Sequence, residues 1–203
     1  MWLVAASDDI DRIVRALALQ GGVSSDFDLN TDIPLPEGRV LRPAGVLVAL
    51  QERDGRVDLV LTKRSARLKH HPGQIAFAGG KVDPADNGPV AAALREAEEE
   101  IGLPRAFVEV LGSLPVHETV TGFAITPVIG LIREPFDERA EPGEVDEIFR
   151  VPLMHVTDPT QFRIEGRRWQ GRRRYYYAVP YGPYYIWGAT ARILRGLADR
   201  VTQ

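Results

Sequence analysis

The sequence predicts an α+β fold, an α/β/α sandwich in which helices cover both faces of a mixed β-sheet. Three observations lead to this prediction. Short apolar runs typical of strands lie on both sides of one central helix pattern, and a second amphipathic pattern lies near the C-terminus. The chain has 203 residues, 44% of them hydrophobic and 26% charged, which is enough to bury one sizeable core.

Composition excludes several classes of protein. The chain contains no cysteine, so it has no disulfide framework, cysteine-ligated zinc site, iron–sulfur cluster or thiol nucleophile. Its formal net charge of −3 argues against a dedicated nucleic-acid-binding protein. No apolar window is long enough to span a membrane, and the N-terminal apolar run is too short for a signal peptide. We therefore expect a cytoplasmic protein that binds neither nucleic acid nor a membrane, while the sequence leaves a homodimer open.

The first elements form an N-terminal extension. Ser7 is an N-cap candidate for an amphipathic helix over residues 8–19, which Gly21 and Gly22 would end. The residues from there to position 38 hold Asp, Asn, Pro and Gly without a sustained period, which is typical of a linker. We therefore predict a helix and linker over residues 1–38, followed by the main domain over residues 39–203.

The main domain alternates strands with the central helix. Two apolar runs flank a polar turn at Asp54-Gly55, which predicts a β-hairpin, and a loop rich in Gly and basic residues then leads to Gly80. Strand patterns follow the central helix, and a last helix follows an aromatic segment that we interpret as core packing. The predicted strands cover residues 45–50, 57–62, 107–114, 125–133, 149–151, 162–169 and 173–179, and the last helix covers residues 188–199.

The central helix is predicted over residues 89–101. Asn87 or Gly88 suits its N-cap, Pro89 suits its first position, and Gly102 suits the left-handed position after its end. Apolar residues at helical spacing form its buried stripe, namely Val90, Leu94, Ala97 and Ile101. Three glutamates at i, i+3 and i+4 share another face, namely Glu96, Glu99 and Glu100.

These glutamates predict a bound cation. Three carboxylates on one face repel one another, and they lie near the helix C-terminus, where the macrodipole also disfavours negative charge. Carboxylate oxygens prefer hard ions, which makes Mg²⁺ or Mn²⁺ the natural candidate. The alternative is a solvated surface in which Arg95 and Glu99 form a plain i, i+4 ion pair.

The segment from Arg95 to Leu103 resembles the second half of the Nudix box, which runs Arg-Glu-apolar-any-Glu-Glu-any-Gly-apolar. The resemblance implies the Nudix fold, divalent metal and hydrolysis of a diphosphate linked to another group. It further implies that Gly80 is the loop glycine of the metal site, that Arg95 orients the glutamates, and that the metal ligands are Glu96, Glu99 and Glu100. The first half departs from the pattern, because Asp86 replaces a glutamate and eight rather than seven residues separate it from Arg95. We assign Asp86 no role from the sequence.

A second segment, from Val60 to Gly80, resembles the signature of coenzyme A pyrophosphatases within the Nudix superfamily. Its spacing matches throughout, with Val60, Lys69 and Ala78 replacing Leu, Arg and Pro. Coenzyme A carries a 3′-phosphate besides its diphosphate, so its site needs extra positive charge. The predicted substrate-binding residues are Arg64, Arg67, Lys69, Gly79 and Lys81. A solvated basic loop is the alternative for the cationic residues.

The resemblance implies metal-assisted attack of water on a diphosphate phosphorus, with 3′,5′-ADP and 4′-phosphopantetheine as products from coenzyme A. The general base stays open among Glu96, Glu99, His117, Glu118, Glu144 and Glu147. Six arginines between Arg163 and Arg174 could hold an anionic substrate or nucleic acid, or reflect codon bias on an exposed hairpin. Other nucleoside diphosphate derivatives, such as ADP-ribose, a dinucleotide or a nucleoside triphosphate, and a non-catalytic nucleotide-binding role remain alternatives.

Overall fold

The computed structural model describes residues 3–32, 38–169 and 171–203. The helices are α1 (Leu3–Ala18), α2 (Gly88–Ile101), α3 (Leu153–Val156) and α4 (Gly188–Val201), with short 3₁₀ turns η1 (Arg105–Phe107) and η2 (Pro159–Gln161). The strands are β1 (Ser24–Ser25), β2 (Arg42–Arg53), β3 (Arg56–Arg64), β4 (Ile75–Ala76), β5 (Ala78–Lys81), β6 (Val108–Ser113), β7 (His117–Glu118), β8 (Phe123–Ile132), β9 (Val145–Pro152), β10 (Arg163–Trp169) and β11 (Arg172–Ala178).

Within the described ranges, strands β1 to β9 form one mixed sheet. Its centre is the parallel pair β2 and β8, and β3 extends it as the antiparallel partner of both β2 and β9. The turn between β2 and β3 consists of Asp54 and Gly55, both with positive φ, as a two-residue hairpin requires. The short strand β5 pairs with the first part of β2 and places Gly79 and Gly80 beside it.

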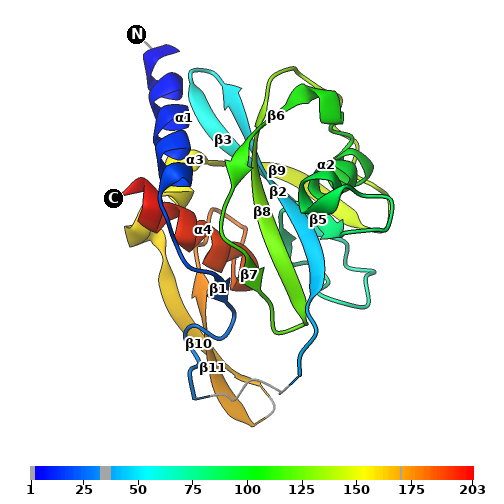
Figure 1. Cartoon of the computed structure of the whole chain (residues 1–203), viewed down its shortest axis with the longest axis vertical. Coiled ribbons are helices and arrows are strands. Elements are labelled where there is room, and N and C mark those ends of the chain that lie inside the picture. Colours follow the sequence, from blue (N-terminus) through cyan, green and yellow to red (C-terminus); the bar gives the residue numbers. More distant parts are fainter. Residues whose placement is uncertain (1–2, 33–37, 170) are drawn as a thin grey trace.

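Helices cover both faces of this sheet, as predicted (Figure 1). One face packs against α2 through a cluster that includes Leu47, Val60 and Val128. The opposite face packs against α1 and α4 through a larger cluster that includes Leu59 and Leu131. The alternation of side chains along each strand therefore divides the core into two layers. No helix in the described part of the chain is long and apolar enough to cross a membrane.

The N-terminal extension departs from the prediction in two ways. Helix α1 begins at Leu3, so Ser7 lies inside the helix and is not its N-cap. The expected linker contains β1, which pairs in parallel with β7, although residues 33–37 lie outside the described ranges. The segment is docked by Asn30, whose side chain accepts from the Tyr175 N–H and donates to the Tyr175 carbonyl. Long-range hydrogen bonds of this kind leave no periodic signal in the sequence.

Strand β9 is longer than predicted. The apolar pattern predicted only residues 149–151, whereas the strand runs from Val145 to Pro152. The reason is that charged residues interrupt the pattern, and Asp146, Glu147 and Arg150 each find a specific polar partner.

Strands β10 and β11 form a separate hairpin that projects from the body of the molecule (Figure 1). Its arms agree with the predicted ones to within a residue. The register places Arg167 opposite Arg174 and Arg168 opposite Arg173. Like charges in such positions destabilise a hairpin, so its attachment to the body through Asn30 and the β11–α4 contact holds it in place.

Candidate active site

The acidic helix α2 is held against the sheet by a very close backbone approach. A Cβ atom at Gly45 of β2 would lie 1.9 Å from the carbonyl oxygen of Pro89, so only glycine fits there. At the other end Gly102 adopts φ 73°, and the N–H groups of Gly102 and Leu103 donate to Glu98 and Ala97. This is the predicted left-handed cap, which fixes where the helix ends.

Strand β5 brings Gly79 and Gly80 to the glutamates of α2. A Cβ at Gly80 would lie 2.3 Å from Oε1 of Glu96, so the carboxylate of Glu96 rests directly on this glycine. The N–H of Gly79 donates to Oε2 of Glu100 over 3.2 Å. The loop and helix residues singled out in the sequence therefore meet in space.

The three glutamates have different surroundings. Glu100 is only 5% exposed, the side chain of Glu96 is 18% exposed, and that of Glu99 is 56% exposed. Burial raises the pKa of Glu100 to about 7, and the negative charges of Glu96 and Glu144 add to this effect. Burial also raises the pKa of Glu96, although Arg95 partly offsets it. Two carboxylates thus turn inward, while Glu99 stays on the surface.

Arg95 connects the glutamates to the loop before the helix. Its guanidinium donates to Glu96 over 2.9 Å and to Glu99 over 3.0 Å. It also donates to the Lys81 carbonyl and, through two nitrogens, to the carboxylate of Asp86 at 3.0 and 2.9 Å. This bidentate pair lowers the pKa of Asp86 and raises that of Arg95.

Asp86 is therefore a site residue that sequence reasoning missed. Its side chain is 5% exposed, and its carboxylate also accepts the N–H of Asp83 over 2.9 Å. Despite the extra residue in the spacing, its carboxylate reaches Arg95 across the start of α2, where Gly88 has φ 82°. The sequence feature that could have identified Asp86 is an acidic side chain close to the position where the Nudix box has glutamate.

The donor atoms suit a hard divalent ion. Within the described ranges, no three His, Asp or Glu side chains are grouped closely enough to hold a metal. Yet the buried carboxylate of Glu100 receives a single hydrogen bond, and its nearest charged neighbours include two further carboxylates. A cation would offset this excess of negative charge, and carboxylate oxygens are the ligands that Mg²⁺ and Mn²⁺ prefer.

The basic loop between β3 and β4 lies beside this acidic cluster. The positive charge of Arg64, at the end of β3, acts on the carboxylate of Glu100. Arg67 and Lys69 are exposed within the loop, and Lys81 is exposed at the end of β5. Two backbone hydrogen bonds close the base of the loop. The N–H of Arg64 donates to the carbonyl of Gln74, and the N–H of Gly73 donates to the carbonyl of Arg64.

The general-base candidates outside the helix lie in different places. His117 is completely buried and contacts Ser24 and Asp26 through its two ring nitrogens. Glu118 pairs with Arg39, and Glu147 accepts the Tyr184 hydroxyl over 2.5 Å. Glu144 is the one whose charge acts on both Glu96 and Glu100.

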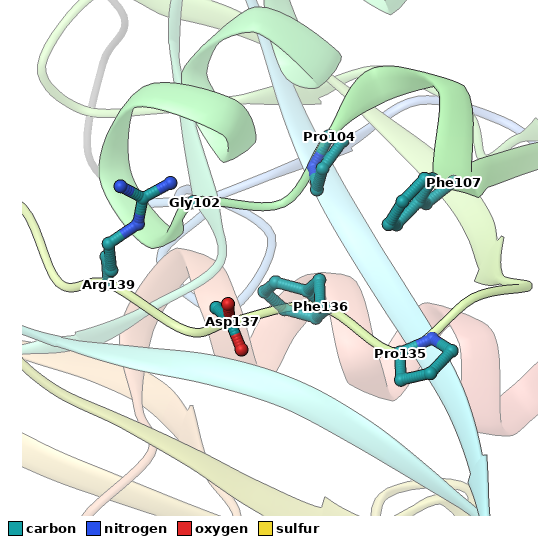
Figure 2. A pocket seen from close by; sticks show the side chains of 7 residues that line it. All are labelled: Gly102, Pro104, Phe107, Pro135, Phe136, Asp137 and Arg139. Carbon is teal, nitrogen blue, oxygen red and sulfur yellow. The ribbon is translucent and has the colours of Figure 1, made fainter.

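A hollow of about 330 Å³ lies beyond the C-terminal end of α2 (Figure 2). Its walls contain Phe107 and Phe136, with Arg139 on the helix side. The N–H groups of Arg139 and Glu141 donate to the carbonyls of Ile101 and Glu100, which ties this segment to the last turn of α2. None of the residues predicted for the site lines the hollow; the lining residues are Gly102, Pro104, Phe107, Pro135, Phe136, Asp137 and Arg139.

Comparison with known proteins identifies the family. The NUDIX domain model matches residues 41–176. A protein named Uncharacterized Nudix hydrolase NudL from Enterobacter sp. (strain 638) is 38% identical over 185 residues, covering 86% of this chain and 96% of the relative. Its namesake from Citrobacter koseri is 42% identical over 160 residues, covering 79% and 83%. The crystal structure of the MutT protein from Methanosarcina mazei Go1 shares the fold, with a TM-score of 0.51 and 17% identity over 83% of this chain and 99% of that one. The chain therefore belongs to the Nudix family and is a Nudix diphosphatase.

Proposed function

We propose that the protein hydrolyses the diphosphate bond of coenzyme A or its derivatives, giving 3′,5′-ADP and 4′-phosphopantetheine. One observation carries this proposal. The loop that resembles the coenzyme A signature leads through β4 and β5 into Gly79 and Gly80, which contact the glutamates of α2. This contact supports one site, which the cationic and acidic residues of the two motifs would border.

The cations suit the phosphates of coenzyme A. Arg64 ends β3 where the loop begins, and its charge acts on Glu100, so it would bind the diphosphate. Arg67 and Lys69 are exposed and free to reach a 3′-phosphate that extends away from the scissile bond. Gly79 and Lys81 would border the diphosphate from β5, because a strand with two glycines lets a ligand approach its backbone closely.

Mg²⁺ or Mn²⁺ would be held by the carboxylates of Glu96, Glu99 and Glu100 with the backbone of Gly80. A bound divalent ion neutralises diphosphate charge and lowers the pKa of water. Arg95 keeps Glu96 and Glu99 oriented, and Glu144 is the general base best supported by its position. Hydrolysis adds one water across the P–O–P bond, so the base needs only to accept one proton.

The proposal also covers the domain division, the cellular location and the binding partners of the protein. We assign residues 39–203 to the Nudix hydrolase domain and residues 1–38 to the N-terminal extension, which carries α1 and β1. The lack of cysteine is consistent with a cytoplasmic enzyme, and its partner is a small molecule rather than nucleic acid or a membrane.

A product assay tests the proposal. The purified protein is given coenzyme A, 3′-dephospho-coenzyme A, ADP-ribose and a dinucleotide in parallel with Mg²⁺ or Mn²⁺, and products are identified by mass. We expect 3′,5′-ADP and 4′-phosphopantetheine from coenzyme A. Preferred cleavage of ADP-ribose or the dinucleotide would assign the site to another diphosphate, and no cleavage of any compound would favour a nucleotide-binding role.

A variant pair tests the role of the basic loop. Arg67→Ala should weaken cleavage of coenzyme A much more than that of 3′-dephospho-coenzyme A, because only the former carries the 3′-phosphate. Arg15→Ala, which removes an exposed arginine from α1 on the opposite face of the sheet from α2, is the matched control. Equal losses on both substrates would mean that Arg67 does not bind the 3′-phosphate.

A further inference from the structure

An irregularity in the pairing of β3 with β9 lies at the border of the proposed site. Lys63 pairs with Glu147, but Arg64, the next residue along β3, pairs with Val145. Asp146 is therefore an extra residue without a partner on β3, which makes this position a β-bulge. A bulge turns the side chain of the extra residue in a new direction and is common next to active sites.

The bulge directs Asp146 towards the basic loop. Its Oδ2 atom accepts the N–H of Ala66 over 2.9 Å, and this N–H together with the side chain of Ser65 lowers the pKa of Asp146. Ser65 is only 1% exposed, and its Oγ atom accepts the N–H of Arg67 over 3.3 Å. The carboxylate of Asp146 thus attaches the first turn of the basic loop, Ser65–Arg67, to β9.

Glu144, the residue directly before β9, connects the same turn to the acidic cluster. The carbonyl of Glu144 accepts the N–H of Ser65 over 2.8 Å, while its negative charge acts on Glu96 and Glu100. Arg64, which precedes Ser65 and pairs with Val145, also acts on Glu100 through its charge. The bulge therefore fixes how far the cations of the loop lie from the carboxylates of α2.

We propose that Asp146 is a positioning residue, which holds the Ser65–Arg67 turn at the distance from the acidic helix that recognition of the 3′-phosphate requires. This inference rests on the proposed function. Asp146 does not touch the substrate; it acts through Ser65 and Ala66, and its loss would leave the basic residues present but misplaced.

The test compares Asp146→Ala with Asp158→Ala. Asp158 has the same chemistry outside the site, because its carboxylate caps the η2 turn through the N–H and hydroxyl of Thr160 at 2.9 and 2.7 Å. We expect Asp146→Ala to raise the KM for coenzyme A about 10-fold, with a smaller change for 3′-dephospho-coenzyme A and little change in kcat. Asp146→Asn keeps one acceptor oxygen and should restore part of the loss. Asp158→Ala should leave kcat and the KM values for both substrates unchanged.

Amide hydrogen exchange gives a readout that needs no substrate. In Asp146→Ala the amides of Ala66 and Arg67 should exchange faster than in the wild type, while Asp158→Ala should leave them unchanged. Unchanged exchange at these amides, or an equal KM change on both substrates, would overturn the role of Asp146. If the loop opens but the wild type does not cleave coenzyme A, the proposed function fails and the positioning of the loop by Asp146 stands.

Discussion

Asp86 fixes the orientation of Arg95, and through Arg95 it influences Glu96 and Glu99, which it does not contact itself. Arg95 has several carboxylates within reach, namely Asp83, Asp86, Glu96 and Glu99. Its two-point contact with the buried carboxylate of Asp86 fixes the plane of the guanidinium. That plane determines which oxygens of Glu96 and Glu99 remain available for a metal.

We predict that Asp86→Asn lowers kcat about 10- to 100-fold, as is typical when a residue that orients metal ligands is lost. The amide keeps the size of the side chain but can accept from only one guanidinium nitrogen in that plane. Asp83→Asn is the control, because the Asp83 side chain is 61% exposed and lies 3.7 Å from Arg95. Steady-state kinetics with Mg²⁺ would measure both, and equal effects would show that total charge near Arg95 matters rather than its orientation.

Glu100 should make the stability of the metal-free protein depend on pH. Its pKa in the folded state is raised from 4.5 to about 7, so its contribution to stability is complete below pH 4.5 and is lost as the pH rises through 7. At pH 8 the buried anion costs on the order of 3 kcal/mol. Glu100→Gln copies the neutral form and removes this cost, although it should also remove most turnover.

Urea unfolding in EDTA at several pH values would measure this effect. The stability of Glu100→Gln relative to the wild type should grow between pH 5.5 and pH 8. A difference that stays constant over this range would show that Glu100 has the same protonation in the folded and unfolded states, so that burial does not raise its pKa in the metal-free protein. A separate measurement of kcat tests the metal-site assignment. Glu99→Gln and Glu100→Gln should both lose most turnover, and retained kcat in either of these two variants would contradict the assignment.

At the scale of elements, the site depends on how closely α2 approaches the sheet. The carbonyl of Pro89 and the backbone of β2 touch at Gly45, and the carboxylate of Glu96 touches β5 at Gly80. Neither contact leaves space for a side chain. The spacing between helix and sheet is therefore set by glycine backbone, and the positions of the glutamates follow from it.

We predict opposite signs for two Gly→Ala substitutions. Gly45→Ala would push its methyl group into the Pro89 carbonyl, so it should destabilise the fold by about 1–3 kcal/mol and lower activity. Gly196 lies inside α4, where the nearest atom to an added Cβ is a flexible Arg192 nitrogen at 3.6 Å. Gly196→Ala should stabilise by about 0.5–1 kcal/mol, because alanine favours the helix. Thermal unfolding would measure both, and a neutral Gly45→Ala would mean that α2 can shift without loss.

Elements with local signals could be predicted from the sequence, and those held by distant partners could not. The β2–β3 hairpin has its Asp-Gly turn, and α2 has Pro89 and Gly102. Strand β1 and most of β9 depend on hydrogen bonds to residues far along the chain. The same difference applies to the site. Arg95 and Glu99 are one helical turn apart, so their ion pair could be predicted, whereas Asp146 and Ala66 are 80 positions apart in the chain.

At the scale of the whole molecule, α1 is a structural part of the fold despite its place in the N-terminal extension. Its residues Ala6, Ile13 and Ala16 are buried, and the helix contacts α4, β3 and β6. Ile13 belongs to the same core cluster as Leu59 and Leu131 of the central sheet. The layer opposite the acidic helix is therefore completed by residues that the sequence alone assigned to an extension.

We predict that Ile13→Ala destabilises the whole domain by about 2–5 kcal/mol, because it leaves a cavity in the core beneath the sheet. Val14→Ala, one position along the same helix, should change stability by less than about 0.5 kcal/mol, since Val14 is 46% exposed. Unfolding would be followed both by far-ultraviolet circular dichroism and by loss of diphosphatase activity. If α1 and the Nudix domain form one cooperative unit, both signals shift together in Ile13→Ala. If activity persists after the helical signal of α1 has melted, the helix is a separable extension and the catalytic domain is stable without it.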